Sequence, residues 1–222
     1  LTIGNATVTE GNAGTVNAVF SVTLSAASSS TVTVDYSTFD GSAVAPADYV
    51  AASGTLTFTA GQTSKQITVA VKGETLNEIN ETYTVNLTNP VNATISGSGI
   101  ATGTITNDDA VPTLSINNVT GAEGNSGTTS FTFTVTLSAA SGLPVTVDFG
   151  TADGSAAAPG DYQAQTGTLA FNPGQTTKTI AVLVNGDTST EASETFTVAL
   201  SNPVNATISS TGIGTGTITN DD

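Results

Sequence analysis

Carboxylates are the side chains in this sequence that could do chemistry. The chain has 18 acidic residues, three Lys residues, and no His or Cys. Ser–His and Cys–His nucleophilic sites are therefore excluded, and the absence of Trp argues against a carboxylate pair in a sugar-binding cleft. The sequence also lacks a glycine-rich phosphate loop that ends in Lys. We predict that the protein is not an enzyme and that its carboxylates serve another purpose.

The acids occupy repeated positions. Every acid in the first half of the chain has an acid 113 residues later, although many neutral positions have changed. Asp35 and Asp148 fall within expected strands and are interpreted as solvent-facing, whereas Asp48 and Asp161 precede Tyr and are interpreted as turn caps. The other acids lie in expected loops or at strand ends: Glu10, Asp40, Glu74, Glu78, Glu81, Asp108 and Asp109, then Glu123, Asp153, Asp187, Glu191, Glu194, Asp221 and Asp222.

Convergence of these loops would create a cation site. If the loops meet at one end of the fold, seven carboxylates per copy come together without Lys or Arg, which is costly unless a cation neutralises them. Oxygen ligands in flexible loops favour Ca²⁺ over zinc or copper, and also over Mg²⁺, which demands tight octahedral geometry. We therefore predict Ca²⁺ as the cofactor. A solvated acidic surface, as in a halophilic protein, is the alternative.

Alternating apolar and polar residues predict the elements that hold these acids. In FTFTVTL, Phe131, Phe133, Val135 and Leu137 face one side and the Thr residues face the other. Similar runs recur between breakers such as ADGS, NPGQ and NGD, and Thr and Val suit a pleated, half-buried surface. Six or seven such strands per copy predict an all-β fold of antiparallel, immunoglobulin-like β-sandwiches.

An internal repeat sets the domain organisation. TEGNAGT at Thr9–Thr15 matches AEGNSGT at Ala122–Thr128, and LTNPVNATIS matches LSNPVNATIS with no gap in between. We predict a domain at 1–109, a short linker at 110–113 and a second domain at 114–222. The linker contains Pro112 and is not expected to be a floppy tether. Because the chain starts almost inside a strand, we expect it to be part of a longer protein.

The stretch Asp148–Pro203 strongly resembles the Calx-beta domain. The matching features are a DG-S/T-A turn, a DY, a GTL-x-F, a PGQT-x-K and an E-x-x-E before an F-x-V-x-L strand, and both copies end in TITNDD. The resemblance implies tandem seven-stranded Greek-key sandwiches that bind Ca²⁺ at one end, with the same seven pairs of acids as ligands. Where calcium-sensing members have several consecutive acids, this chain has only Glu74 or Asp187, which implies fewer ions.

These inferences predict a structural role. We expect a calcium-binding structural or adhesive module of a longer extracellular or cell-surface protein of prokaryotic origin, with Ca²⁺ rigidifying the domain ends and the joint between neighbouring repeats. The alternatives are an adhesin module that binds a glycan or partner surface, and a self-assembling subunit of an extracellular filament. A net charge of −15 argues against nucleic acid as a partner. No apolar run is long enough for membrane insertion.

Overall fold

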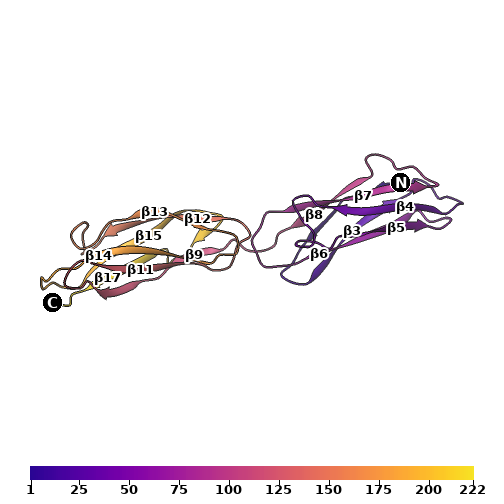
Figure 1. The fold of residues 1–222 in the computed structure, drawn as a ribbon. Helices are drawn as coiled ribbons and strands as arrows, with labels where there is room; N and C mark the ends of the chain where they lie inside the picture. Colours follow the sequence, from indigo (N-terminus) through magenta and orange to yellow (C-terminus); the bar gives the residue numbers. More distant parts are fainter. The chain divides into compact units, whose positions relative to one another are not determined.

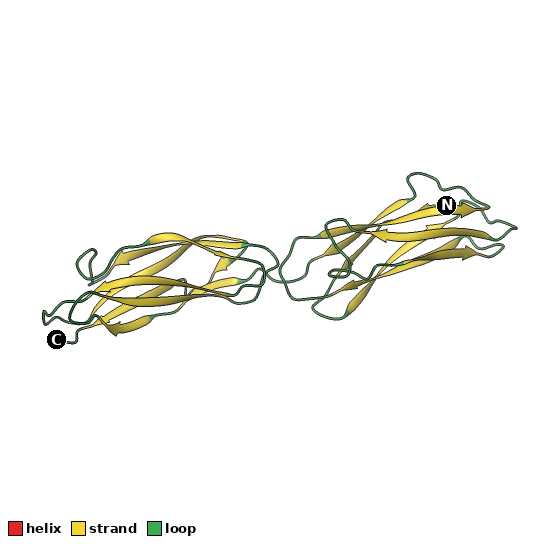
Figure 2. Cartoon of the chain, viewed as in Figure 1, coloured by secondary structure: helices red, strands yellow, loops and turns green.

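The computed structural model describes every residue from Leu1 to Asp222 as strands and connecting loops (Figures 1 and 2). It divides into two compact units, Leu1–Asp109 and Ala110–Asp222. Each unit is a β-sandwich of two sheets around its own core, so the predicted all-β fold is confirmed. No helix capable of crossing a membrane is present. Strand β9 begins at Thr113, so regular structure starts inside the segment predicted as a linker.

The first unit contains a three-stranded and a five-stranded sheet. The strand orders are β1-β3-β6 and β2-β8-β7-β4-β5. The strands are β1 (Thr2–Ile3), β2 (Ala6–Thr9), β3 (Thr15–Thr23), β4 (Val32–Phe39), β5 (Ser53–Phe58), β6 (Ser64–Lys72), β7 (Glu81–Val91) and β8 (Ile100–Thr106).

The second unit repeats this plan with a five-stranded and a four-stranded sheet. The strand orders are β10-β17-β15-β12-β13 and β14-β11-β9-β16. The strands are β9 (Thr113–Ile116), β10 (Val119–Ala122), β11 (Thr128–Leu137), β12 (Val145–Asp153), β13 (Thr166–Phe171), β14 (Thr177–Asn185), β15 (Glu194–Val204), β16 (Thr207–Ile208) and β17 (Ile213–Thr219). If the divided first strand counts as one and the two-residue β16 is set aside, each unit has seven strands.

The pairing differs from the prediction at the first strand of each unit. β1 pairs antiparallel with β3, but β2 pairs parallel with β8, and β10 pairs parallel with β17. β16 is also parallel to its neighbour β9. The cause is a break at Gly4–Asn5, where the chain leaves one sheet and joins the other. Asn5 Oδ1 accepts a hydrogen bond from Thr102 N at 2.9 Å, and Asn118 Oδ1 accepts one from Thr215 N at 2.8 Å at the matching break.

Alternation fills the two cores as predicted. Phe131, Phe133, Val135 and Leu137 of β11 are buried, and the intervening polar residues are not. Each buried side chain of this size contributes about 1.5–3 kcal/mol of transfer free energy. Strands with one buried face give the unit a fixed register, and that register positions the loops at the sandwich ends.

Candidate metal centre

Strand register brings the predicted acid loops of the first unit to one end. β2 and β8 run parallel and end side by side, so Glu10 and Asp108 lie at the same end. β7 starts at this end, with Glu81 opposite Ile105. β4 runs antiparallel to β7 and ends there too, just before Asp40.

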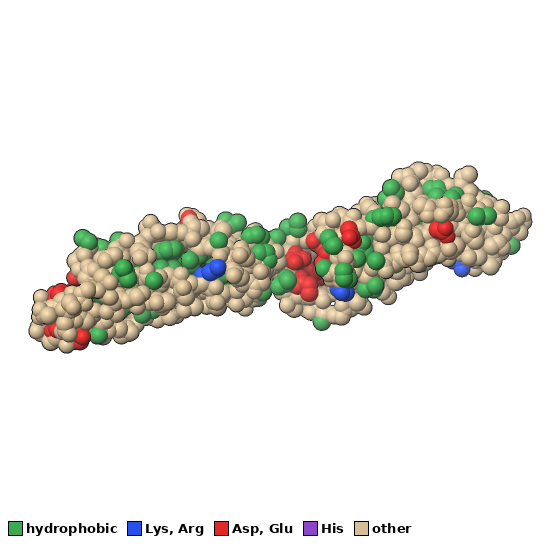
Figure 3. All heavy atoms as spheres, in the orientation of Figure 1, with side chains coloured by type: hydrophobic (Ala, Val, Ile, Leu, Met, Phe, Trp, Pro, Cys, Tyr) green, Lys and Arg blue, Asp and Glu red, His purple; other side chains and the backbone are tan.

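The second unit has the same arrangement at its own acidic end. β10 and β17 run parallel and stop before Glu123 and Asp221. Glu194 begins β15 opposite Ile218, and Asp153 closes β12. Figure 3 shows most of the visible acidic side chains gathered at one end of each unit. The acid-bearing loops therefore meet at one end of the sandwich in both copies, which the alternation of apolar and polar residues alone could not decide.

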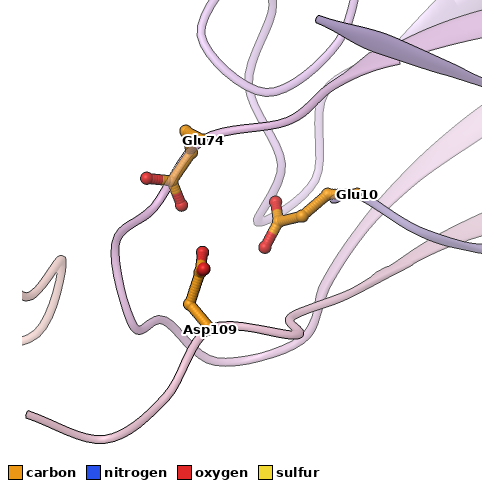
Figure 4. Close-up of side chains that lie close together, drawn as sticks. All are labelled: Glu10, Glu74 and Asp109. Atoms are coloured by element: carbon orange, nitrogen blue, oxygen red, sulfur yellow. The ribbon is translucent and has the colours of Figure 1, made fainter. Parts of the chain in front are cut away.

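Three carboxylates of the first unit point toward one another. Oxygen atoms of Glu10, Glu74 and Asp109 all lie within 4.8 Å of one another (Figure 4). Glu10 is only 6% exposed. Glu74 Oε1 and Asp109 Oδ2 are buried and have no hydrogen-bond partner. Buried anionic oxygens without donors need another source of positive charge, so this triad fits a hard cation such as Ca²⁺.

The cluster raises the pKa of its members. Burial, followed by repulsion from Glu74, raises the pKa of Glu10 to about 7. Burial and repulsion from Asp48 raise the pKa of Glu81 to about 7. Burial also raises the pKa of Glu78, with a further contribution from Glu74. The ionised form of these carboxylates is therefore unfavourable unless a bound proton or cation neutralises it.

Asparagine side chains fasten the acid loop between β6 and β7 of the first unit to the chain end after β8. Asn77 Nδ2 donates to Asp109 O at 3.1 Å. Asn107 Oδ1 accepts a hydrogen bond from Glu78 N at 3.1 Å, and Asn80 Oδ1 accepts one from Asn107 N at 3.1 Å. The loop that carries Glu74 and Glu78 is therefore tied to the segment that carries Asp108 and Asp109.

Asp108 and Asp109 also hold the loop that begins with Glu10. Asp108 Oδ1 accepts a hydrogen bond from Gly11 N at 3.0 Å, and Asp109 Oδ1 accepts one from Asn12 Nδ2 at 2.9 Å. In the second unit, Asp221 Oδ1 accepts a hydrogen bond from Gly124 N at 3.1 Å, and Asp222 Oδ1 accepts one from Asn125. The paired acids that follow the last strand of each unit therefore hold the loop after the first strand by hydrogen bonds, and they are also candidate ligands.

Asp40 and Asp153 lie outside the tightest groups. Asp40 Oδ1 accepts hydrogen bonds from Tyr49 Oη at 2.6 Å and Ala45 N at 2.9 Å. The Tyr49 bond, followed by the backbone bond, lowers the pKa of Asp40, so this acid stays ionised. In the second unit, the hydrogen bond from Tyr162, followed by the backbone bond from Ala158, lowers the pKa of Asp153.

The second unit groups a different set of acids. Oxygen atoms of Asp161, Glu191 and Glu194 lie within 4.8 Å of one another. Glu123 is 4% exposed, and burial followed by repulsion from Asp187 raises the pKa of its carboxyl. Asp187 itself is exposed and accepts a hydrogen bond from Ser189 N at 2.7 Å.

Asp48 and Asp161 were not predicted as members of the cluster. Their interpretation as turn caps holds, because Asp48 Oδ2 accepts a hydrogen bond from Val44 N at 2.6 Å and Asp161 Oδ2 accepts one from Ala157 N at 2.7 Å. It is incomplete, because these acids also raise the pKa of Glu81 and Glu194. No local sequence signal marks this contact, which joins residues far apart in the chain.

Comparison with known proteins gives relatives along most of the chain. A family model described as the Calx-beta domain matches residues 4–109 and 107–222. Sodium/calcium exchanger 3 of Homo sapiens is 30% identical over 197 residues, which are 79% of this chain and 21% of that protein. Sodium/calcium exchanger 1 of Canis lupus familiaris is 31% identical over 193 residues, or 78% and 20% of the two chains. The chain thus spans about a fifth of the length of these relatives.

Two similar solved structures have titles that refer to the calcium-binding domains of Calx proteins. "Crystal structure of calcium binding domain CBD12 of CALX1.1" is 26% identical with a TM-score of 0.43, covering 89% of this chain and 76% of that one. "Crystal structure of Apo-form Calx CBD1 domain" is 25% identical with a TM-score of 0.45, covering 51% of this chain and all of that one. Because the family model matches both units almost end to end, the chain belongs to the Calx-beta domain family.

Proposed function

We propose that this chain is a tandem calcium-binding module with a Ca²⁺ site at the acidic end of each unit. The observation that carries the proposal is the pair of buried, donor-free oxygens on Glu74 and Asp109, two carboxylates that lie close to that of Glu10. The names of the sodium/calcium exchangers support Ca²⁺ as the cation. The absence of His and Cys supports a hard ion with oxygen ligands.

Different residues would contribute differently to binding. Glu10, Glu74 and Asp109 would hold the ion in the first unit, with Asp40, Glu78, Glu81 and Asp108 completing the shell. Glu123, Asp187, Glu191 and Glu194 would do so in the second unit, with Asp153, Asp221 and Asp222. When bound, Ca²⁺ would supply the positive charge that the cluster lacks. The residues themselves cross-link separate loops, so binding would stabilise the folded state by about 2.7 kcal/mol at a Ca²⁺ concentration of 100 times Kd.

The biological role that we propose is structural rather than catalytic. Asp108 and Asp109 immediately precede Ala110, where the second unit begins, so an ion held by Asp109 would restrain the chain as it leaves the first unit. In a longer repeat protein, Ca²⁺ would then rigidify domain ends and the joints between neighbouring repeats. The proposal of an extracellular or cell-surface host rests on a composition rich in Thr, Ser, Asn and Gly without Met or Cys.

Calorimetry tests the site. Ca²⁺ titration of the 222-residue chain should give saturable binding and raise the melting temperature, and EDTA should reverse the rise. The double variant Glu81→Gln, Glu194→Gln should lose most of the response. Asp35→Asn with Asp148→Asn is the matched control, because it removes the same number of charges from acids that hold Thr and Asn side chains on the sheets.

The outcomes separate an ion site from an acidic surface. An unchanged melting temperature in millimolar Ca²⁺ would overturn the proposal. Equal losses in the two double variants would show that the response comes from general surface charge. Small-angle scattering with and without Ca²⁺ tests the joint, because an identical scattering profile would contradict stiffening between repeats.

A further inference from the structure

In each copy, a buried tyrosine donates a hydrogen bond to an acid of the candidate site. Tyr49 Oη donates to Asp40 Oδ1 at 2.6 Å, and Tyr162 Oη donates to Asp153 Oδ1 at 2.6 Å. Both tyrosines are only 1% exposed. In each copy a backbone N–H also donates to the same Oδ1 atom, from Ala45 at 2.9 Å or Ala158 at 3.0 Å.

The tyrosine ring is fixed on two sides. Tyr49 stacks on Tyr83 with ring centroids 4.4 Å apart and an interplanar angle of 15°. Its backbone forms an isolated bridge with Val71 at the end of β6, just before the acid loop begins. Tyr162 is held in the same way, stacked on Phe196 at 4.5 Å and bridged to Val184. The hydroxyl is therefore a rigid donor whose position the core determines.

The turn that carries each acid is also fixed against the strand that follows the acid loop. Ala43 N donates to Thr82 O at 3.0 Å, and Thr82 N donates to Ser42 Oγ at 2.8 Å. Thr82 directly follows Glu81. Asp40 is thus anchored through its turn to the start of β7 and through Oδ1 to the core. Its Oδ2 atom accepts no hydrogen bond from the protein.

We propose that Tyr49 and Tyr162 are positioning residues of the cation site: each hydroxyl saturates one carboxylate oxygen of Asp40 or Asp153 and holds the other ready for the ion. This inference rests on the proposed calcium function. A pre-oriented carboxylate loses less freedom when it binds a cation, so the hydroxyl raises affinity without touching the ion. The repetition of the whole arrangement in both copies is what this role requires, because each copy has its own acidic end.

The test replaces both tyrosines with phenylalanine in the 222-residue chain. Tyr49→Phe with Tyr162→Phe keeps the rings and their stacking but removes the donors. Calcium titration should show binding weakened by roughly tenfold, which corresponds to one hydrogen bond to a charged group. The matched control is Tyr83→Phe, which removes a buried hydroxyl that has no hydrogen-bond partner. It should leave calcium affinity unchanged.

Repeating the substitutions in a chain that already lacks the two acids distinguishes a positioning role of the tyrosines from a general effect on stability. In a chain with Asp40→Asn and Asp153→Asn, adding the two Tyr→Phe changes should cause no further loss of the Ca²⁺-induced rise in melting temperature. A further loss in that background would overturn the inference. So would calcium affinity equal to that of the unmodified chain in the Tyr49→Phe, Tyr162→Phe variant. Absence of binding by the unmodified chain would instead overturn the proposed function itself.

Discussion

The backbone at Gly73 lies so close to Gly11 that a Cβ atom at Gly73 would fall 2.2 Å from the Gly11 carbonyl oxygen. The second unit repeats the contact, with a Cβ at Gly186 falling 2.0 Å from the Gly124 oxygen. Backbone cannot yield as a flexible side chain can, so these positions require glycine. The crossing places the loop of Glu74 against the loop that starts at Glu10.

Replacing Gly73 with Ala should therefore damage both stability and calcium binding. The added methyl must push the two acid loops apart, and we expect the free energy of unfolding to fall by about 2 kcal/mol or more. Calcium affinity should fall as well, because the triad spans this crossing. Thermal unfolding and calorimetric titration measure the two effects. Gly4→Ala is the control, because its Cβ would meet only Ser21 O at 3.9 Å, and equal damage in both variants would refute the argument.

Neutralising Glu10 should have opposite effects with and without calcium. Glu10→Gln removes a buried charge that its neighbours repel, so at pH 8 in EDTA the variant should melt at a higher temperature than the unmodified chain. In saturating Ca²⁺ it should melt at a lower temperature, because a ligand has been lost. Differential scanning calorimetry in the two buffers measures this crossover. A variant that is less stable in both buffers would contradict the role of Glu10 as a destabilising charge that calcium relieves.

Calcium-free protein should lose stability as the pH rises. The pKa values of Glu10 and Glu81 lie at about 7, above their ordinary value of 4.5. The folded state therefore binds protons more tightly than the unfolded state, and this stabilisation is complete below pH 4.5 and lost as the pH rises through 7. Melting temperatures in EDTA should accordingly be higher at pH 5 than at pH 8. Saturating Ca²⁺ should reduce this difference, and a pH-independent melting temperature in EDTA would contradict the raised pKa values.

Sequence patterns predicted the strands because apolar alternation directly reflects which face is buried. Phe131 and Val135 follow that rule, and they lie in the core. The parallel pairing of β2 was not predictable in the same way, because it depends on a break at Asn5 whose amide oxygen binds a distant backbone N–H.

The sequence was enough to predict which residue types form the candidate site, but not which of these residues contact one another. Equal spacing of acids in two copies singled out Glu10 and Glu74, yet alternation carries no information on which loops meet at which end. Asp48 was interpreted as a turn cap because that role is local, whereas its repulsion of Glu81 arises only through the fold. The grip of Tyr49 on Asp40 was missed for the same reason: a Tyr near an acid is ordinary in sequence, and only the stacked ring fixes the donor.

The ring stacked on the buried tyrosine carries a hydroxyl in the first copy and not in the second, and this difference predicts opposite effects of exchanging it. Tyr83 and Phe196 occupy equivalent places, each stacked beneath a tyrosine and packed 2.4 Å from the position of a Cβ at Gly103 or Gly216. Tyr83 Oη is buried without a hydrogen-bond partner. Tyr83→Phe should therefore raise the free energy of unfolding by about 1–2 kcal/mol, since it removes an unsatisfied polar group.

The reverse change, Phe196→Tyr, buries a hydroxyl in the equivalent site and should lower the free energy of unfolding by about 1–3 kcal/mol. Urea unfolding of both variants in EDTA measures the two effects, with unchanged m-values showing that the exposed surface is the same. Loss of stability in Tyr83→Phe would mean that the hydroxyl of Tyr83 has a partner in solution. In that case a buried water would be the donor or acceptor, and Phe196→Tyr would recruit one at little cost.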